Sequence, residues 1–96
     1  MKLHIHFAIG ELKVDEVVTG DTAEAVVRTI QKRVAKELGF LKGAVVSAMT
    51  PLAFAQEVTR RYNDALKDDA PIPTSCDEFL QFGIEKNFAT RLDEGS

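Results

Sequence analysis

Two histidines and an aspartate near the start of the chain are the residues best suited to metal chemistry. His4 and His6 are separated by one residue, so in an extended strand both side chains project from the same face. A two-residue turn at positions 10–11 would bring a second strand back beside the first and place Asp15 opposite His6. Imidazole nitrogens and a carboxylate are ligands for zinc and other divalent transition metals. The three residues form a candidate metal site; the alternative is a solvent-facing strand with a polar cross-strand pair.

Cys76 is the single cysteine of the chain and the second candidate for chemistry. It falls in the first turn of a predicted helix, where the positive end of the helix dipole lowers the pKa of a thiol. The neighbouring Asp77 and Glu78 act in the opposite direction and favour the neutral thiol. No histidine is near in sequence to serve as its base, so we expect a partly buried, unreactive cysteine.

A basic stripe forms the third candidate site. Arg28, Lys32 and Lys36 are four residues apart and therefore lie on one side of a helix, with Arg33 and Lys42 nearby. Such a stripe can attract phosphate groups or an acidic partner. The formal net charge of −3 and the pI near 5.3 argue against nucleic acid as the partner. A solvated helix face is the alternative.

Large apolar residues outside the predicted core form the fourth candidate. Phe40 and Leu41 follow the first predicted helix, and Phe82 lies off the main apolar stripe of the last one. A chain of 96 residues cannot bury every large side chain. We therefore predict an exposed patch, or an uncovered strand edge, that contacts a second copy or another protein. An ordinary monomer core that absorbs these residues is the alternative.

Motifs typical of enzymes are missing from the sequence. It contains neither a Walker loop nor the Gly-x-Gly-x-x-Gly, Gly-x-Ser-x-Gly and His-Glu-x-x-His patterns. No apolar run approaches the ~20 residues of a membrane-spanning helix. The first residues alternate between apolar and polar types, unlike a signal peptide. These observations predict a cytoplasmic protein that needs no cofactor unless a divalent transition metal binds.

Alternating residues predict an N-terminal hairpin that would position the histidines. Apolar side chains recur at every second position of the first strand, and a glycine-containing turn at 10–11 pairs Leu3 with Val18. In this register Glu16 falls on the apolar face opposite Ile5. We expect a bulge near Asp15 and Glu16 to remove it from that face.

Three helices are expected after the hairpin. The first has Asp21 as N-cap and ends at Gly39, and the second opens with Thr50 and Pro51. Residues 44–49 fit either a third strand or a helix. A loop over 67–73 precedes a third helix capped by Ser75. The apolar stripes of these three helices are Val27, Ile30, Val34 and Leu38; Phe54, Val58, Tyr62 and Ala65–Leu66; and Phe79–Leu80, Ile84, Phe88 and Leu92.

The hairpin followed by Asp21-Thr22-Ala23-Glu24 and an amphipathic helix resembles the start of a ubiquitin-like β-grasp domain. The resemblance covers about the first 39 residues, and helices stand where that family has its later strands. We therefore assign no family.

Together these elements predict an α+β domain over residues 1–92, in the order ββα(β)αα, with a frayed tail at 93–96. We expect a small non-enzymatic interaction or regulatory protein that self-associates as a homodimer or binds another protein. Metal or small-ligand binding through the histidines, and phosphate or nucleic-acid binding through the basic stripe, are the alternatives.

Overall fold

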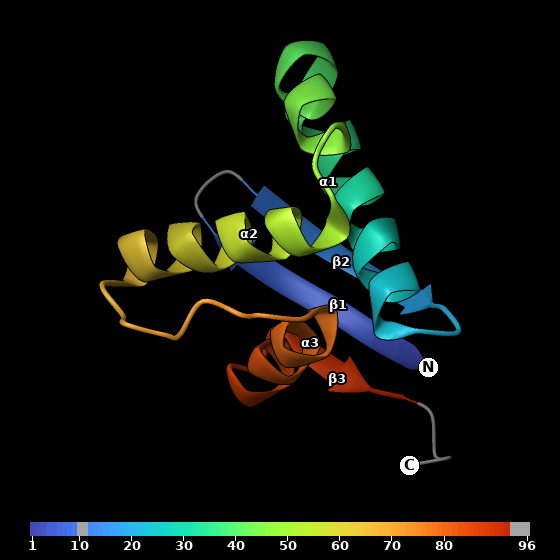
Figure 1. Ribbon diagram of the computed structural model, residues 1–96. Helices are drawn as coiled ribbons and strands as arrows, with labels where there is room; N and C mark the ends of the chain where they lie inside the picture. The colour runs from blue at the N-terminus through green and yellow to red at the C-terminus, as the bar shows by residue number, and fades with distance from the viewer. Residues whose placement is uncertain (10–11, 93–96) are drawn as a thin grey trace.

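A three-stranded antiparallel sheet carries all three helices on one face (Figure 1). The computed structural model describes residues 1–9 and 12–92. Strands β1 (Lys2–Ile9) and β2 (Leu12–Thr19) form the N-terminal hairpin. Their register pairs Leu3 with Val18 and Ile9 with Leu12. The predicted hairpin register is therefore confirmed, while its turn at 10–11 lies outside the described residues.

Glu16 remains on the helix-covered face of the sheet, because the register continues through it without a bulge. The predicted bulge is wrong. The carboxylate instead reaches helix α1 (Ala23–Ser47), where its Oε2 lies 3.3 Å from Nε of Arg33. This ion pair provides a partner for a carboxylate that would otherwise face apolar side chains.

The core lies between this face of the sheet and the helices. Alternate strand residues point into it, as the period-two pattern predicts. Among the side chains that the structure describes, the hairpin contributes Leu3, Ile5, Phe7, Val14 and Val18 to the core, and α1 contributes a buried stripe of Val26, Val27, Ile30 and Val34. The opposite face of the sheet, which bears both histidines, has none of the helices packed on it (Figure 1).

Helix α1 begins one residue later than predicted. The N-cap is Thr22, whose Oγ1 accepts a hydrogen bond of 3.1 Å from the backbone N–H of Ala25. Thr22 has the extended backbone conformation of an N-cap residue, with φ −134°. The expected cap at Asp21 is wrong.

Gly39 divides α1 into two helical segments that pack against each other. Its φ of 86° and ψ of −172° leave the helical region, which glycine does without steric cost. The chain then reverses, and residues 40–47 form a second segment that we call the arm. The side-chain Nε2 of Gln31 donates hydrogen bonds of 2.8 Å to the carbonyl oxygens of Val46 and Met49, which fix the returning chain beside α1. The alternative of a strand at 44–49 is therefore wrong, because this segment is helical up to Ser47.

Helix α2 (Pro51–Leu66) begins as the sequence predicts. Thr50 caps it, with its Oγ1 accepting a hydrogen bond from the N–H of Ala53. Phe54, Val58 and Tyr62 form its buried stripe. The predicted extension of this stripe to Ala65–Leu66 is wrong, since both residues are exposed. The helix ends next to them at Lys67, which adopts a left-handed conformation.

Helix α3 (Cys76–Glu85) is shorter than predicted and leads into the third strand. Ser75 caps it, accepting from the N–H of Glu78. Asn87, with φ 65°, turns the chain after the helix, and β3 (Ala89–Arg91) then pairs with β1. The predicted helical stripe through Phe88 and Leu92 is therefore wrong.

The third strand is thus at residues 89–91, at the end of the element order β1 β2 α1 α2 α3 β3. The α+β class with an N-terminal hairpin is confirmed. Residues 93–96, predicted as a frayed tail, lie outside the described residues.

Candidate functional site

The two histidines lie side by side on the open face of the sheet, with ring centroids 4.9 Å apart. Nε2 of His4 lies 2.6 Å from Oδ1 of Asp15 on β2. Nε2 of His6 lies 3.0 Å from Oγ1 of Thr90 on β3. The backbone register places Asp15 opposite His6 as predicted, but its carboxylate contacts His4. Diagonal contacts of this kind are within reach of long side chains on a sheet.

This arrangement does not bring the two imidazoles to one point. Their Nε2 atoms contact partners on the two different strands that flank β1. Over residues 1–9 and 12–92, no group of three His, Cys, Asp or Glu side chains is placed to hold a metal ion. Binding a metal through His4, His6 and Asp15 would first require both rings to leave their hydrogen bonds. The site remains a prediction from the sequence.

The basic stripe on α1 is partly neutralised by carboxylates of the same chain. Arg28 lies 3.3 Å from Glu24, one helical turn earlier. The adjacent Arg33 contacts Glu37 as well as Glu16. Lys32 and Lys36 are exposed. Because these ion pairs lower the local positive potential, the stripe offers less to a phosphate group than its sequence suggests.

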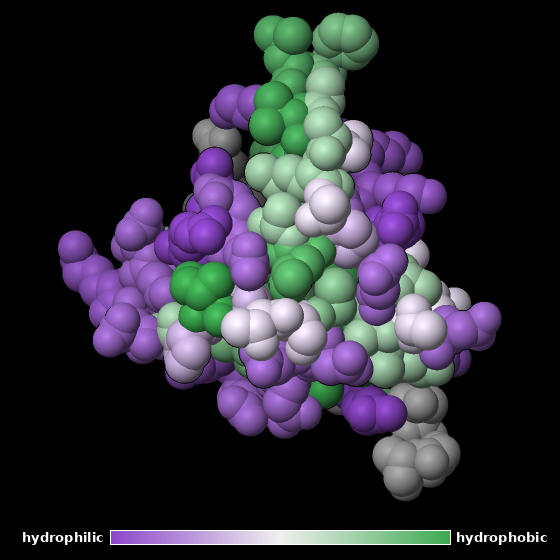
Figure 2. All heavy atoms as spheres, viewed as in Figure 1, coloured by the Kyte–Doolittle hydropathy of each residue, from purple (hydrophilic) through white to green (hydrophobic). Residues whose placement is uncertain are grey.

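The arm presents the most exposed large apolar side chains of the described residues. Phe40 is 91% exposed, Leu41 is 79% exposed and Val45 is 63% exposed. We call these three residues the arm tip. Figure 2 shows hydrophobic side chains at the end of the arm, which projects away from the rest of the molecule. The prediction of exposed apolar residues at Phe40 and Leu41 is confirmed.

Phe82 belongs to a different part of the molecule. Its ring lies 5.0 Å from the ring of Tyr62, in an edge-on contact, and it packs partly buried against the core. The structure therefore separates Phe82 from the other two predicted interface residues. Val45, in contrast, is an arm-tip residue that sequence reasoning missed, because the apolar run at 44–49 fitted an interior element equally well.

Cys76 lies half-buried in the first turn of α3. Burial raises the pKa of its thiol, and the nearby carboxylates of Glu24 and Asp77 raise it further. The expected direction is thus confirmed and Asp77 contributes to it, but the other carboxylate is Glu24 on α1 rather than the predicted Glu78. Both histidines lie on the opposite face of the sheet and do not supply it with a base.

Asp68, in the loop after α2, joins that helix to α3. Its Oδ2 accepts a hydrogen bond of 2.5 Å from the hydroxyl of Tyr62 and lies 3.3 Å from Nζ of Lys86. The hydrogen bond from Tyr62, followed by one from the backbone N–H of Asp69 and the contact with Lys86, lowers the pKa of Asp68 to about 2. Each of these contacts favours the ionised carboxylate, so the cluster stabilises the fold more when Asp68 is charged than when it is protonated.

Replacing Asp68 with asparagine should therefore destabilise the protein at neutral pH, with an effect that decreases in acid. A lowered carboxyl pKa contributes stability above the ordinary Asp value of about 4, and this contribution is lost as the pH falls towards the folded-state value. Urea unfolding of the wild type and of Asp68→Asn, measured between neutral pH and about pH 2, checks this. A difference between the two proteins that is the same at both ends of this range would contradict it.

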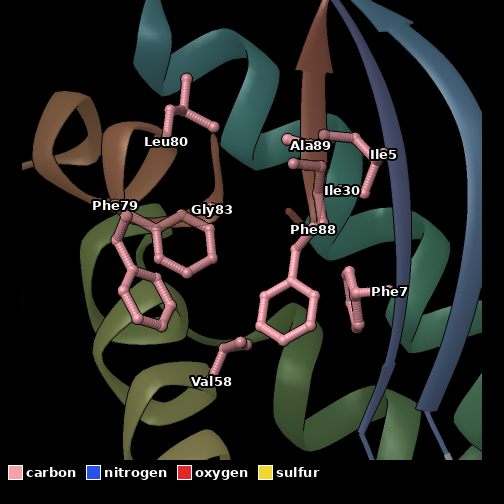
Figure 3. Close-up of a pocket in the computed structure, with 10 residues that line it drawn as sticks. Ile5, Phe7, Ile30, Val58, Phe79, Leu80, Gly83, Phe88 and Ala89 are labelled. Carbon is pink, nitrogen blue, oxygen red and sulfur yellow. The ribbon is translucent and has the colours of Figure 1, made fainter. Parts of the chain in front are cut away.

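A small cavity lined by apolar side chains lies between the sheet and the helices. Figure 3 shows its lining of apolar side chains from β1, α1, α2 and α3, together with Phe88 and Ala89. Its volume is about 30 Å³. Ligand pockets are on the order of 300–1,000 Å³, so this space is a packing defect.

None of the described helices is both long and apolar enough to span a membrane. Comparison of the chain with protein families, curated proteins and solved structures finds no match, so its function has to be argued from its own geometry.

Proposed function

We propose that this chain is a small, non-enzymatic interaction protein that self-associates as a homodimer through the arm tip. The observation that carries the proposal is the exposure of three large apolar side chains of the projecting arm, Phe40, Leu41 and Val45. Burying one such side chain is favourable by about 1.5–3 kcal/mol, so these residues offer the molecule a large free-energy gain from association.

The arm also holds its tip in a defined position. Gln31 binds the carbonyl oxygens of Val46, near the C-terminal end of the arm, and of Met49 just after it, and Gly43 packs closely against the backbone at Ala35. An interface on a preorganised segment loses less conformational entropy on binding than one on a mobile loop. This supports the arm as a contact element.

The cytoplasmic location predicted from the sequence is part of the proposal. With Cys76 as its single cysteine, the chain folds without an internal disulfide, as proteins of the reducing cytoplasm do.

Sedimentation equilibrium of the wild type and of the double variant Phe40→Ser, Leu41→Ser tests the proposal. We expect the wild type to be dimeric at micromolar concentration and the double variant to have a dissociation constant at least about 100-fold higher. Leu66→Ser is the matched control, because Leu66 is 58% exposed but lies at the end of α2, outside the arm. This control should dimerise like the wild type. A wild type that remains monomeric at high micromolar concentration would overturn the proposal.

A further inference from the structure

The outer edge of β2 presents a row of backbone groups that no described strand covers. The sheet order β2-β1-β3 places β2 at the edge. The N–H of Gly20 donates a hydrogen bond to the carbonyl of Met1. With the observed register, this means that the even-numbered residues of β2 form the hydrogen bonds with β1. In an antiparallel pair the bonded and non-bonded positions alternate. The odd-numbered residues Lys13, Asp15 and Val17 therefore direct their N–H and C=O groups away from the sheet.

The edge of β2 also has few of the features that prevent strand pairing. It is eight residues long, whereas the opposite edge strand, β3, has three. Its register contains no bulge, and its sequence contains no proline. Bulges and prolines protect exposed edges, and so do charged side chains, of which β2 has Lys13, Asp15 and Glu16. The long, regular backbone of β2 can therefore pair with another strand only where these charges are matched.

We propose that β2 pairs antiparallel with β2 of a second copy, so that one continuous sheet crosses the dimer. This rests on the self-association proposed above and defines its second contact. The charges on β2 favour a two-fold axis at Val14. In that register Lys13 of each copy lies opposite Asp15 of the other copy, so the dimer contains two such pairs of opposite charge. An axis at Asp15 would place the two Asp15 carboxylates opposite each other. An axis at Glu16 would do this to the two Glu16 carboxylates. Like charges directly opposite each other are unfavourable in both registers.

The arm and the edge of β2 lie on the same side of the molecule. Helix α1 passes over β2 where Arg33 contacts Glu16, and the arm continues beyond the sheet (Figure 1). An interface of standard size buries about 800 Å² on each partner, from about 20 residues. The three side chains of the arm tip are too few for this area. An edge strand on the same side of the molecule would provide the additional contact that a stable dimer needs.

Charge reversal on β2 tests the pairing, with the dissociation constant of the dimer measured by sedimentation equilibrium. Lys13→Glu replaces two attractive contacts with two repulsive ones and should raise the dissociation constant about tenfold. The double variant Lys13→Glu, Asp15→Lys restores opposite charges and should return to within about threefold of the wild type. Lys2→Glu is the matched control: it makes the same charge change on β1 and should have no effect.

Lys13→Pro tests the backbone contact separately from charge. Its N–H points outward, so proline removes a hydrogen-bond donor from the edge while the pairing with β1 remains. We expect it to weaken the dimer at least as much as Lys13→Glu, and circular dichroism establishes that each variant is folded. If the wild type is dimeric but neither Lys13 variant weakens it, strand pairing is wrong and the arm-tip dimer stands. A monomeric wild type would instead overturn both proposals.

Discussion

Gly43→Ala is expected to lower the free energy of unfolding by about 1–3 kcal/mol, the usual range for overpacking a buried site. The reason is steric. A Cβ atom at this position would lie 2.3 Å from the carbonyl oxygen of Ala35 and 3.1 Å from its carbonyl carbon. These are backbone atoms of α1 and cannot move aside like the end of a flexible side chain. The arm must therefore shift away from α1, even though alanine is the better helix former by about 1 kcal/mol. Urea unfolding measures the loss, and amide exchange over residues 40–47 should become faster.

Gly83→Ala is the control for this prediction. At this position, in α3, the nearest atom to an added Cβ is Cβ of Ala89 at 3.7 Å, which is an ordinary contact. The added methyl group also faces the small core cavity that Gly83 lines. Here the helix propensity of alanine should dominate, and the protein should be stabilised by about 1 kcal/mol. If the two substitutions have the same sign, the close packing of the arm is not what determines the effect at Gly43.

The hairpin could be predicted from the sequence because its signals are local and agree with one another. Side chains alternate through both strands, and the two-residue spacing between them fixes which residues face each other. The strand pairing at Glu16 follows the register set by this spacing, although this charged residue interrupts the apolar pattern. The charge of Glu16 is paired with Arg33 on α1, and the alternation of residues along a strand gives no information about which helix residue will lie over it.

The arm could not be predicted because its structure depends on contacts between residues distant in sequence. The apolar run at 44–49 fits a short strand and a helix equally well. The choice is made by the left-handed turn at Gly39 and by the fit of Gly43 against Ala35. The same holds for β3, whose three residues are too few to show a periodic pattern and which forms by pairing with β1.

Of the candidate sites, the sequence predicts the exposure of single residues better than the contacts between side chains. The exposure of Phe40 and Leu41 follows from their position after a helix-ending glycine. Which histidine contacts Asp15 depends on side-chain conformation, which the strand register does not determine. The burial of Phe82 against Tyr62 joins α3 to α2, and helix periodicity says nothing of how two helices pack.

Gln31→Leu is expected to destabilise the protein by about 1–3 kcal/mol, the cost of leaving partly buried carbonyl groups without their hydrogen bonds. Gln31 is 5% exposed, and its Nε2 donates to the carbonyl oxygens of Val46 and Met49. Leucine has a similar volume but no donor, so the packing is retained while both bonds are lost. The carbonyl of Val46 keeps a bond from the N–H of Met49, so most of the cost should come from the carbonyl of Met49.

The control for this change is Gln81→Leu on the exposed side of α3, where the side chain bonds only to Glu85 among its described contacts. Substitutions of this kind usually change stability by less than about 0.5 kcal/mol. Sedimentation of Gln31→Leu then connects stability with function. Because Gln31 is buried and holds the C-terminal end of the arm, its loss should weaken the dimer without removing any residue of the arm tip. If Gln31→Leu unfolds at the same urea concentration as Gln81→Leu and dimerises like the wild type, the arm does not need this side chain to hold its position.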